Sequence, residues 1–171
     1  KKGKEYAVLV VGDVTKDDVL VRLHSSCLTG DVFHSLRCDC RPQLELALRR
    51  ATKEKKGIII YLPQEGRGIG LTNKIRAYAL QQQKGLDTVD ANTRLGLSVD
   101  DRRYDGAGAI LRDLGVSRVR LLTNNPLKAA GLEAAGITVV SQVQVETLPT
   151  KHNRGYLSTK KKRMGHRLKK V

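Results

Sequence analysis

Residues 119–140 have the sequence VRLLTNNPLKAAGLEAAGITVV, and this stretch holds one complete copy of the unit that decides the fold. Its apolar beginning predicts a strand over Val119–Leu122, and the Leu- and Ala-rich part predicts a helix over Pro126–Ala135. Gly136 is a helix stop, and Ile137–Val140 is a second short apolar run typical of a buried strand. A strand, a helix and a strand in this order predict two parallel strands joined by a helix that covers the sheet.

The same reasoning applies to the rest of the chain. The apolar periodicity predicts strands over Tyr6–Val11, Val19–Leu23 and Ile58–Leu62, and helices over Gln43–Lys53, Leu71–Gln83, Asp105–Leu114 and Tyr156–Lys170. The two N-terminal strands are close in sequence and are expected to pair antiparallel. We therefore predict an α/β fold of three layers, α/β/α, around a mixed sheet. Residues 1–171 contain no Pro/Gly/Ser linker and are expected to form a single domain.

The composition indicates a folded protein that does not enter membranes. Of the 171 residues, 40% are hydrophobic, which is enough to bury an aliphatic core. No apolar run approaches the roughly 20 residues that cross a bilayer, and no signal peptide stands near the start. We therefore expect a cytoplasmic protein. Because the chain begins at Lys1 without a Met, a preceding N-terminal segment is expected to be missing.

The charge predicts an anionic ligand but does not identify it. Lys and Arg number 32 against 17 Asp and Glu, a formal net charge of +15. Such a charge attracts nucleic acid, phosphorylated metabolites or anionic membrane surfaces. Residues 151–170 carry only basic charges, which a solvated basic helix explains as well as a binding surface does. The low aromatic content disfavours nucleic acid, since single-strand binding relies on stacked rings.

Three cysteines, Cys27, Cys38 and Cys40, indicate a metal site. An odd number of cysteines with two separated by one residue is a poor disulfide framework. Two thiolates this close, with a third eleven residues upstream, can bind one Zn²⁺ and leave a fourth position for water, as in catalytic zinc sites. From the spacing alone, small buried thiols remain the alternative.

Two further motifs follow predicted strands. The segment 64–71 (QEGRGIGL) joins a strand to a helix, where glycines let backbone N–H groups approach phosphate and where Arg67 adds a charged fork. The segment 123–128 (TNNPLK) lies at the carboxyl end of a strand, where open α/β sheets bind ligands. A tight turn and a helix cap are the respective alternatives. Another polar cluster, 100–104 (DDRRY), precedes a helix.

Together these motifs resemble one family, GTP cyclohydrolase II. The family motif Arg-x-His-Ser-Glu-Cys-Leu-Thr-Gly-Asp, followed by Arg-Cys-Asp-Cys, matches Arg22 to Cys40, and the likeness extends from about Tyr6 to segment 162–166. Two departures lie beside the expected metal ligands. Ser26 stands where the family has Glu, and residues 41–42 (Arg-Pro) replace a Gly-aromatic pair.

The resemblance implies roles for the matched residues. The catalytic residues would be Asp100, Arg102 and Tyr78, and the ligands of one Zn²⁺ per chain would be Cys27, Cys38 and Cys40. The positions implied to contact GTP are Arg22, Leu23, His24, Ser25, Ser26, Gln43, Glu65, Gly66, Arg67, Thr88, Thr123 and Lys128. Mg²⁺ bound with the triphosphate and a homodimer are implied in the same way.

The implied reaction is a hydrolysis that opens the imidazole ring of GTP as the first step of riboflavin synthesis. Formate and pyrophosphate leave, and the product is 2,5-diamino-6-(5-phosphoribosylamino)pyrimidin-4(3H)-one. Arg102 would attack the α-phosphorus while Asp100 takes its proton, and water activated by zinc would attack C8 of guanine. Tyr78 favours complete deformylation over arrest at a formylated intermediate.

Two other classes of function fit the sequence less well than this enzyme. A nucleic-acid-binding zinc module lacks a fourth Cys or His at finger spacing. A degenerate homologue acting as a structural subunit is disfavoured because Asp100, Arg102, Tyr78 and the three cysteines are all present.

Overall fold

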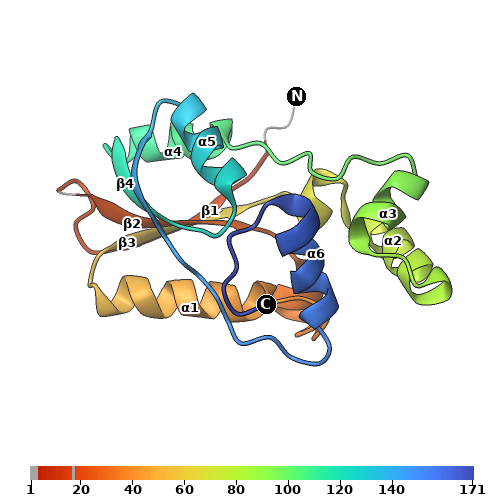
Figure 1. Cartoon of the computed structure of the whole chain (residues 1–171). Coiled ribbons are helices and arrows are strands. Elements are labelled where there is room, and N and C mark those ends of the chain that lie inside the picture. Colours follow the sequence, from red (N-terminus) through yellow and green to blue (C-terminus); the bar gives the residue numbers. More distant parts are fainter. Residues whose placement is uncertain (1–3, 17) are drawn as a thin grey trace.

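A computed structural model describes residues 4–16 and 18–171, and its centre is a single sheet (Figure 1). In the described residues the sheet has five strands in the order β1-β3-β2-β4-β5. The strands are β1 Ala7–Val11, β2 Val19–Ser25, β3 Gly57–Leu62, β4 Arg118–Leu122 and β5 Thr138–Val143. β1 pairs antiparallel with β3, and the other neighbouring pairs are parallel. The predicted mixed sheet is confirmed.

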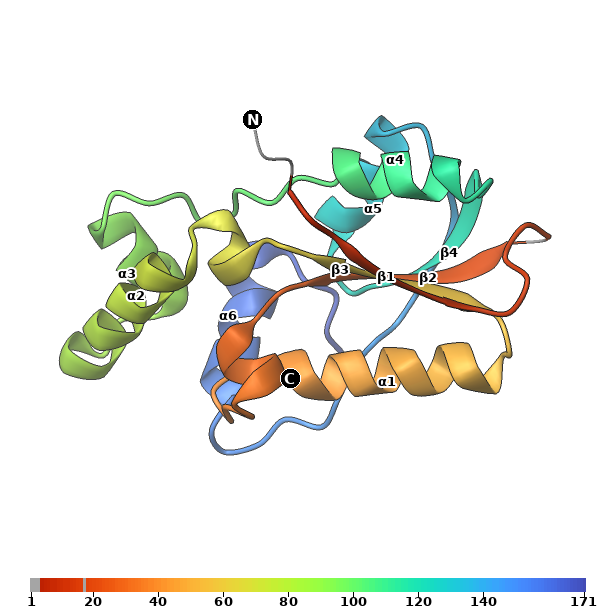
Figure 2. The same ribbon diagram turned by 180° about the vertical axis from the view of Figure 1, so that it is seen from behind.

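Helices cover both faces of the sheet, which confirms the three-layer prediction. The α-helices are α1 Cys40–Lys53, α2 Leu71–Lys84, α3 Thr88–Arg94, α4 Asp105–Asp113, α5 Pro126–Ala134 and α6 Arg154–Met164. A π-helix, Leu28–Val32, and a 3-10 helix, Glu65–Gly68, are shorter. Helices α4 and α5 lie on one face and α1 on the other, whereas α2 and α3 stand beyond one end of the strands (Figures 1 and 2).

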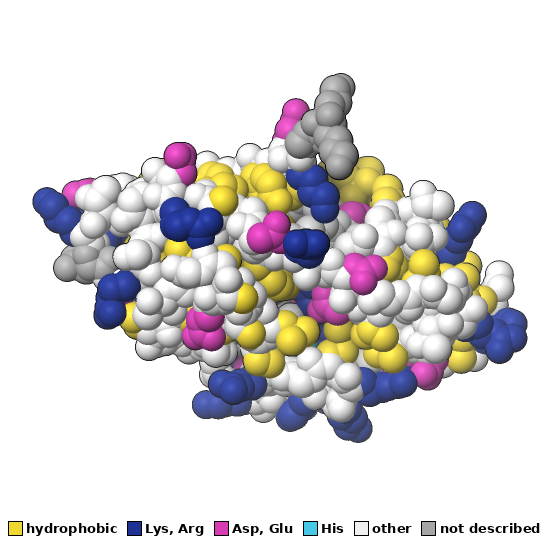
Figure 3. Space-filling view, turned by 90° about the horizontal axis from the view of Figure 1, so that it is seen from above, with side chains coloured by type: hydrophobic (Ala, Val, Ile, Leu, Met, Phe, Trp, Pro, Cys, Tyr) yellow, Lys and Arg dark blue, Asp and Glu magenta, His cyan; other side chains and the backbone are white. Residues whose placement is uncertain are grey.

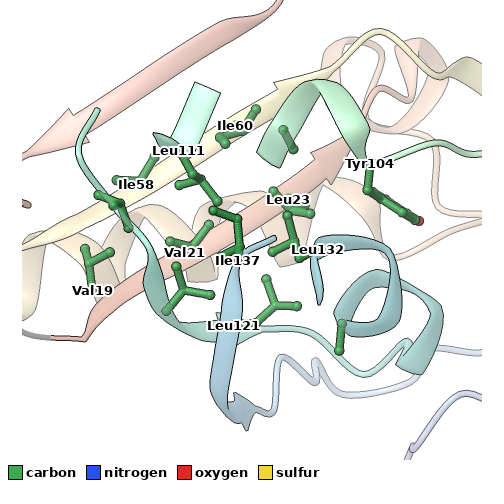
Figure 4. Packing of buried hydrophobic residues seen from close by; sticks show 14 of the residues in the cluster. Val19, Val21, Leu23, Ile58, Ile60, Tyr104, Leu111, Leu121, Leu132 and Ile137 are labelled. Carbon is green, nitrogen blue, oxygen red and sulfur yellow. The ribbon is translucent and has the colours of Figure 1, made fainter. Parts of the chain in front are cut away.

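Successive side chains of β2 point to opposite faces of the sheet, and they pack in two separate hydrophobic cores. Val19, Val21 and Leu23 point to the α4/α5 face, where they pack with buried side chains of those helices (Figure 4). Leu20 packs on the α1 face with Ala47 and its neighbours. Because successive strand residues face opposite sides, Arg22 and His24 follow Leu20 onto the α1 face. This face therefore carries polar side chains at the carboxyl end of a central strand.

The predicted antiparallel pairing of the two N-terminal strands is wrong. β1 pairs with β3, with Ala7 opposite Tyr61, while β2 lies between β3 and β4. Burial explains the difference, since Val19 to His24 are all buried, whereas Leu9 and Val10 of β1 are 45% and 44% exposed. A fully buried strand needs hydrogen-bonding neighbours on both sides. β2 therefore occupies the centre of the sheet and β1 an edge.

Two helical assignments also differ. Helix α3 is not predicted from the sequence; its N-cap, Asp87, accepts hydrogen bonds from the backbone N–H groups of Val89 and Asp90. The helix predicted over Tyr156–Lys170 runs from Arg154 to Met164, because Gly165 adopts a left-handed conformation (φ 64°) at its C-cap. Residues 165–171 then return toward β4 without helical structure.

The surface is basic but mixed. On the face shown in Figure 3, Lys and Arg side chains are spread around the molecule with acidic side chains between several of them. Over residues 4–16 and 18–171, no helix is both long and apolar enough to span a membrane.

Candidate active site

The strands β2, β3 and β4 run parallel, so their carboxyl ends lie at the same end of the sheet. The segments that follow them line one cavity, with an empty volume of about 1000 Å³ when its open mouth is included. The basic side chains that line it are Arg22, Arg67, Lys74, Arg102, Lys128 and Lys160. Its acidic side chains are Asp39 and Glu65, so the cavity suits a polyanion.

The three cysteines converge on this cavity. Cys27 follows β2, and Cys38 and Cys40 lead into α1. Their Sγ atoms all lie within 4.8 Å of one another, and those of Cys27 and Cys38 are 3.8 Å apart. Two thiolates on one tetrahedral zinc ion, each about 2.3 Å from the metal, would also be about 3.8 Å apart. The cluster therefore has the spacing of a three-thiolate metal site.

Lys74, on α2, places a positive charge beside the three cysteines. Its ammonium lies 3.1 Å from the Sγ of Cys27 and 2.8 Å from Oε1 of Glu65. Hydrogen bonds from Cys38 and Cys40, and then the charge of Lys74, hold the pKa of Cys27 well below its ordinary value despite burial. Hydrogen bonds with Cys27 and burial raise the pKa values of Cys38 and Cys40 in turn. The three thiols therefore share their protons, and the ammonium of Lys74 favours thiolate in the cluster.

The buried carboxylate of Asp31 holds the loop that carries Cys27. Its Oδ2 accepts hydrogen bonds from the backbone N–H of Cys27 at 3.0 Å and from the hydroxyl of Tyr61 at 2.9 Å. Nε2 of His24 is 3.1 Å from both carboxylate oxygens, and its ring stacks on Tyr61. Burial lowers the pKa of His24, which favours a neutral ring that donates from Nε2. Nδ1 then remains as a buried acceptor with no partner among the described residues.

A chain of buried contacts links α6 to β2. Nζ of Lys160 lies 3.0 Å from Oδ1 of Asp39, whose Oδ2 accepts a hydrogen bond from the Gln43 amide. Oε1 of Gln43 accepts from Nη2 of Arg22 at 2.6 Å, and Nη1 of Arg22 donates to the carbonyl of Leu122 at 3.0 Å. Nε of Arg22 is buried and unpartnered in the described part of the chain.

Arg102 and Asp100 form a two-pronged ion pair. Nε of Arg102 donates to Oδ1 of Asp100 at 2.8 Å, and Nη2 donates to Oδ2. Arg102 lines the cavity, while Asp100 lines a second pocket that Arg102 also borders. Burial works against the charge of both groups, but their mutual hydrogen bonds raise the pKa of Arg102 and lower the pKa of Asp100. The pair is therefore held in its ionised form.

Lys128 places a buried ammonium in the same region. Its Nζ donates to the carbonyl oxygen of Leu23 at 2.6 Å. Burial, and then the charges of Arg22 and Arg102, lower the pKa of Lys128 well below its usual value. Leu23 itself has its side chain in the hydrophobic core and does not line the cavity. Leu23 therefore meets this region only through its backbone carbonyl, which accepts the hydrogen bond from Lys128.

The loop after β3 has unusual backbone geometry. Gly66 and Arg67 both adopt left-handed conformations, with φ values of 60° and 62°. A Cβ at position 66 would lie 3.0 Å from Cγ1 of Ile69 and 3.2 Å from Cβ of Lys74, so glycine fits there. Both terminal nitrogens of Arg67 are buried and lack a hydrogen-bond partner among residues 4–16 and 18–171, and the guanidinium carbon lies 5.7 Å from the ring centre of Tyr156. Donor nitrogens without a hydrogen-bond partner are suited to bind an anion.

The other residues singled out from the sequence also line the cavity. They are His24, Ser25, Ser26, Gln43, Glu65, Thr88, Thr123 and Tyr78. Oγ of Ser26 accepts a hydrogen bond from the backbone N–H of Gln64 at 3.1 Å. The guanidinium carbon of Arg37 lies 4.5 Å from the ring centre of Tyr78. Burial raises the pKa of Tyr78 to about 12, so its phenol stays protonated.

Several site residues were missed by the sequence analysis as members of the site. These are Asp31, Asp39, Lys74, Tyr156, Lys160 and His166. Lys74 precedes Tyr78 by four residues on a predicted helix, a spacing that places both on one face. Lys160 stands in a run of basic residues, and nothing in the run distinguishes it from its exposed neighbours.

Comparison with known proteins agrees with this geometry. The sequence model of the family described as GTP cyclohydrolase II matches residues 1–144. A riboflavin biosynthesis protein RibBA of Parabacteroides distasonis is 52% identical over 170 residues, which are 99% of this chain and 42% of that protein. Proteins of the same name from Bacillus velezensis and Bacillus subtilis are 54% and 53% identical over 168 residues.

The chain spans less than half the length of these relatives, about 42% of each. Its thiol cluster, ion pair and glycine-rich loop all lie inside the matched residues. This chain belongs to the GTP cyclohydrolase II family.

Proposed function

We propose that this chain catalyses the GTP cyclohydrolase II reaction, the hydrolytic opening of the guanine imidazole ring of GTP in riboflavin biosynthesis. The observation that carries the proposal is the shared cavity. Three thiols with metal-site spacing and the Arg102–Asp100 ion pair line or border it, and basic side chains outnumber acidic ones between them. Such a cavity can hold one end of a nucleotide at the cysteines and the phosphates among the cations.

We propose that Cys27, Cys38 and Cys40 hold one zinc ion per chain. The Sγ separations support this, and so does the ammonium of Lys74, which offsets the excess negative charge of three thiolates on a divalent ion. Zinc with three protein ligands activates water for hydrolysis at neutral pH. Cys27 is fixed by Asp31 through its backbone N–H, so the thiolate is oriented before a metal binds.

At the phosphate end we propose that a nitrogen of Arg102 attacks the α-phosphorus of GTP. The bond to the bridging oxygen breaks, pyrophosphate leaves, and the proton released from Arg102 passes to Asp100 along an existing hydrogen bond. The ion pair raises the pKa of Arg102, so proton loss has to be driven by the forming N–P bond. Water later cleaves the N–P bond and frees the nucleotide. Arg22 and Arg67 supply positive charge for the phosphate oxygens, and Lys128 supplies a further hydrogen-bond donor.

At the guanine end the proposed reaction consumes two water molecules. The first adds at C8 and opens the ring to a formamide, and the second hydrolyses the formamide to formate. Tyr78 lines the cavity as a neutral phenol and can hydrogen-bond the reacting carbonyl oxygen. We therefore propose that deformylation is complete.

The remaining partners follow from the substrate. A triphosphate carries several negative charges, and Mg²⁺ bound to its oxygens would neutralise part of them. We propose that the enzyme works as a cytoplasmic homodimer and does not bind nucleic acid.

The test is product analysis with the purified, zinc-loaded chain. Incubation with GTP and Mg²⁺ should yield formate, pyrophosphate and a diaminopyrimidine that chromatography separates from GTP. ATP serves as a control, since adenine lacks the 2-amino and 6-oxo groups of guanine. Removal of zinc by a chelator should abolish formate and its replacement should restore it. A zinc-loaded chain that leaves GTP unchanged would refute the proposal.

A further inference from the structure

The region beyond the family match contributes directly to the cavity. The family model ends at residue 144, yet Tyr156, Lys160 and His166 line the cavity beside the matched residues. In Figure 1, α6 lies next to the beginning of α1 and toward α3. A solvated basic helix does not describe this arrangement, because Leu157 and Lys160 are buried.

Lys160 is the innermost charged contact of α6. Its side chain is only 10% exposed, and its Nζ lies 3.0 Å from Oδ1 of Asp39, whose side chain is 3% exposed. Asp39 stands between Cys38 and Cys40, and its other oxygen holds the Gln43 amide. A buried carboxylate that loses its cation becomes an uncompensated charge, and its neighbours then rearrange to solvate it.

A second set of contacts joins α6 to α3, whose first residue also lines the cavity. Nη1 of Arg163 lies 2.6 Å from Oδ2 of Asp87 and 2.8 Å from Oδ1 of Asp90. Asp87 caps α3, whose first residue, Thr88, lines the cavity. Beyond the helix, the backbone N–H of Arg167 donates to the carbonyl of Asn124 at 2.9 Å. The C-terminal segment thus bridges α1, α3 and the loop after β4.

We propose that Lys160 is a positioning residue for the nucleotide, which holds Gln43 and Arg22 in their binding geometry through its ion pair with Asp39. The inference rests on the proposed function for the identity of the nucleotide. The contacts that carry it are Lys160 to Asp39, Asp39 to Gln43, and Gln43 to Arg22. Because Gln43 and Arg22 line the cavity, a displaced Asp39 alters the surface that meets the ligand.

The experiment measures, by calorimetry with Mg²⁺, the Kd of a GTP analogue that resists cleavage because a methylene group replaces the oxygen between the α- and β-phosphorus. It is run on the zinc-loaded chain and its variants. Lys160→Met keeps the aliphatic stem and removes the charge, and we expect Kd to rise by about tenfold or more. Lys162→Met is the matched control, since Lys162 is an exposed cation on the same helix. Its Kd should stay within twofold of the unmodified chain. Lys160→Arg retains a cation and should recover part of the affinity.

A double variant, Lys160→Met with Asp39→Asn, separates positioning from direct contact with the ligand. Asparagine is uncharged, so the loss of Lys160 no longer leaves a buried charge without a partner, and its side chain can still accept a hydrogen bond from Gln43. Both the melting temperature and the Kd should therefore recover toward the values of the unmodified chain. If the melting temperature recovers while the Kd stays as high as in Lys160→Met, Lys160 acts on the ligand itself or through Tyr156, whose ring centre lies 5.0 Å from Nζ of Lys160, and the proposal is overturned. An unchanged Kd in Lys160→Met overturns it as well.

The measurement does not depend on turnover. If the unmodified chain binds the analogue but releases no formate from GTP, the proposed function fails while the positioning role can still be judged from Kd. If the chain is active and the variants bind alike, only the positioning role fails.

Discussion

Gly30 packs against the thiol cluster, and replacing it with alanine should damage the proposed metal site although all three cysteines are kept. A Cβ at this position would lie 2.8 Å from the Sγ of Cys38, 3.1 Å from the Sγ of Cys27 and 3.1 Å from the Cβ of Cys40. Gly30 is also buried in the π-helix that follows Cys27, so the added methyl group has no open direction in which to move.

The size of the effect follows from these distances. Non-bonded heavy atoms are comfortable at about 3.5–4.0 Å, so the Cys38 sulfur has to move by roughly 0.7 Å or more. Metal sites keep their bond lengths to within about 0.2 Å, a much smaller tolerance. We expect zinc affinity to fall by about 10–100-fold, the loss typical when the supports of metal ligands are disturbed. Overpacking should also lower the free energy of unfolding by about 1–3 kcal/mol.

The assay is competition for zinc with a chromophoric chelator, together with metal content after dialysis. Gly155→Ala is the matched control, because a Cβ there would meet nothing within 4 Å and the residue lies in a helix. That control should keep its zinc and gain as much as about 1 kcal/mol of stability. If Gly30→Ala bound zinc as tightly as Gly155→Ala does, the three sulfurs would not form the metal site that we propose.

Four further predictions concern individual residues. Ser26→Glu restores the carboxylate that the family motif carries and should raise kcat/KM for GTP; steady-state kinetics with an equal or lower value would contradict this. Cys40→Ser should lose zinc and formate release while GTP still yields pyrophosphate, so formate from a zinc-free variant would count against the assigned roles. Arg102→Ala should slow pyrophosphate release by on the order of 10³-fold, measured with a coupled phosphate assay, and unaltered release would exclude Arg102 as the nucleophile. The pKa of Asp100 is lowered, since hydrogen bonds from Arg102 outweigh burial. Its contribution to the free energy of unfolding should therefore be complete above about pH 4 and be lost as the pH falls through the lowered pKa. Denaturant titrations at pH 6 and pH 3 should show a smaller gap between Asp100→Asn and the unmodified chain at the lower pH.

The layering of the fold could be predicted from the sequence because each element carries its own apolar period. Ile58–Leu62 is a short continuous apolar run, as in strands covered on both faces, and Pro126–Ala134 has a proline at its start and helical spacing. Strand order could not be predicted in the same way. Nearness in sequence favoured pairing of the first two strands, whereas burial of β2 on both faces decided its central place.

The candidate site could also be predicted from the sequence only in part. The residues in specific motifs, such as Cys27 and Arg102, line one cavity, and the roles that the family resemblance implies for them stay predictions. Asp31 and Lys160 could not be found because their roles depend on tertiary neighbours, not on local spacing. Lys160 resembles the exposed lysines after it in sequence, and only the packing of α6 against Asp39 distinguishes it.

The stoichiometry of products from the zinc-loaded chain tests the central claim most directly. The zinc-loaded chain is incubated with Mg²⁺ and GTP labelled with ¹⁴C at C8. In the same samples over time, labelled formate is measured by its radioactivity and pyrophosphate by an enzymatic assay. The proposed reaction predicts one formate for each pyrophosphate, with both increasing together until GTP is consumed. Pyrophosphate without labelled formate, or labelled carbon retained in the nucleotide product, would contradict ring opening and deformylation by this chain.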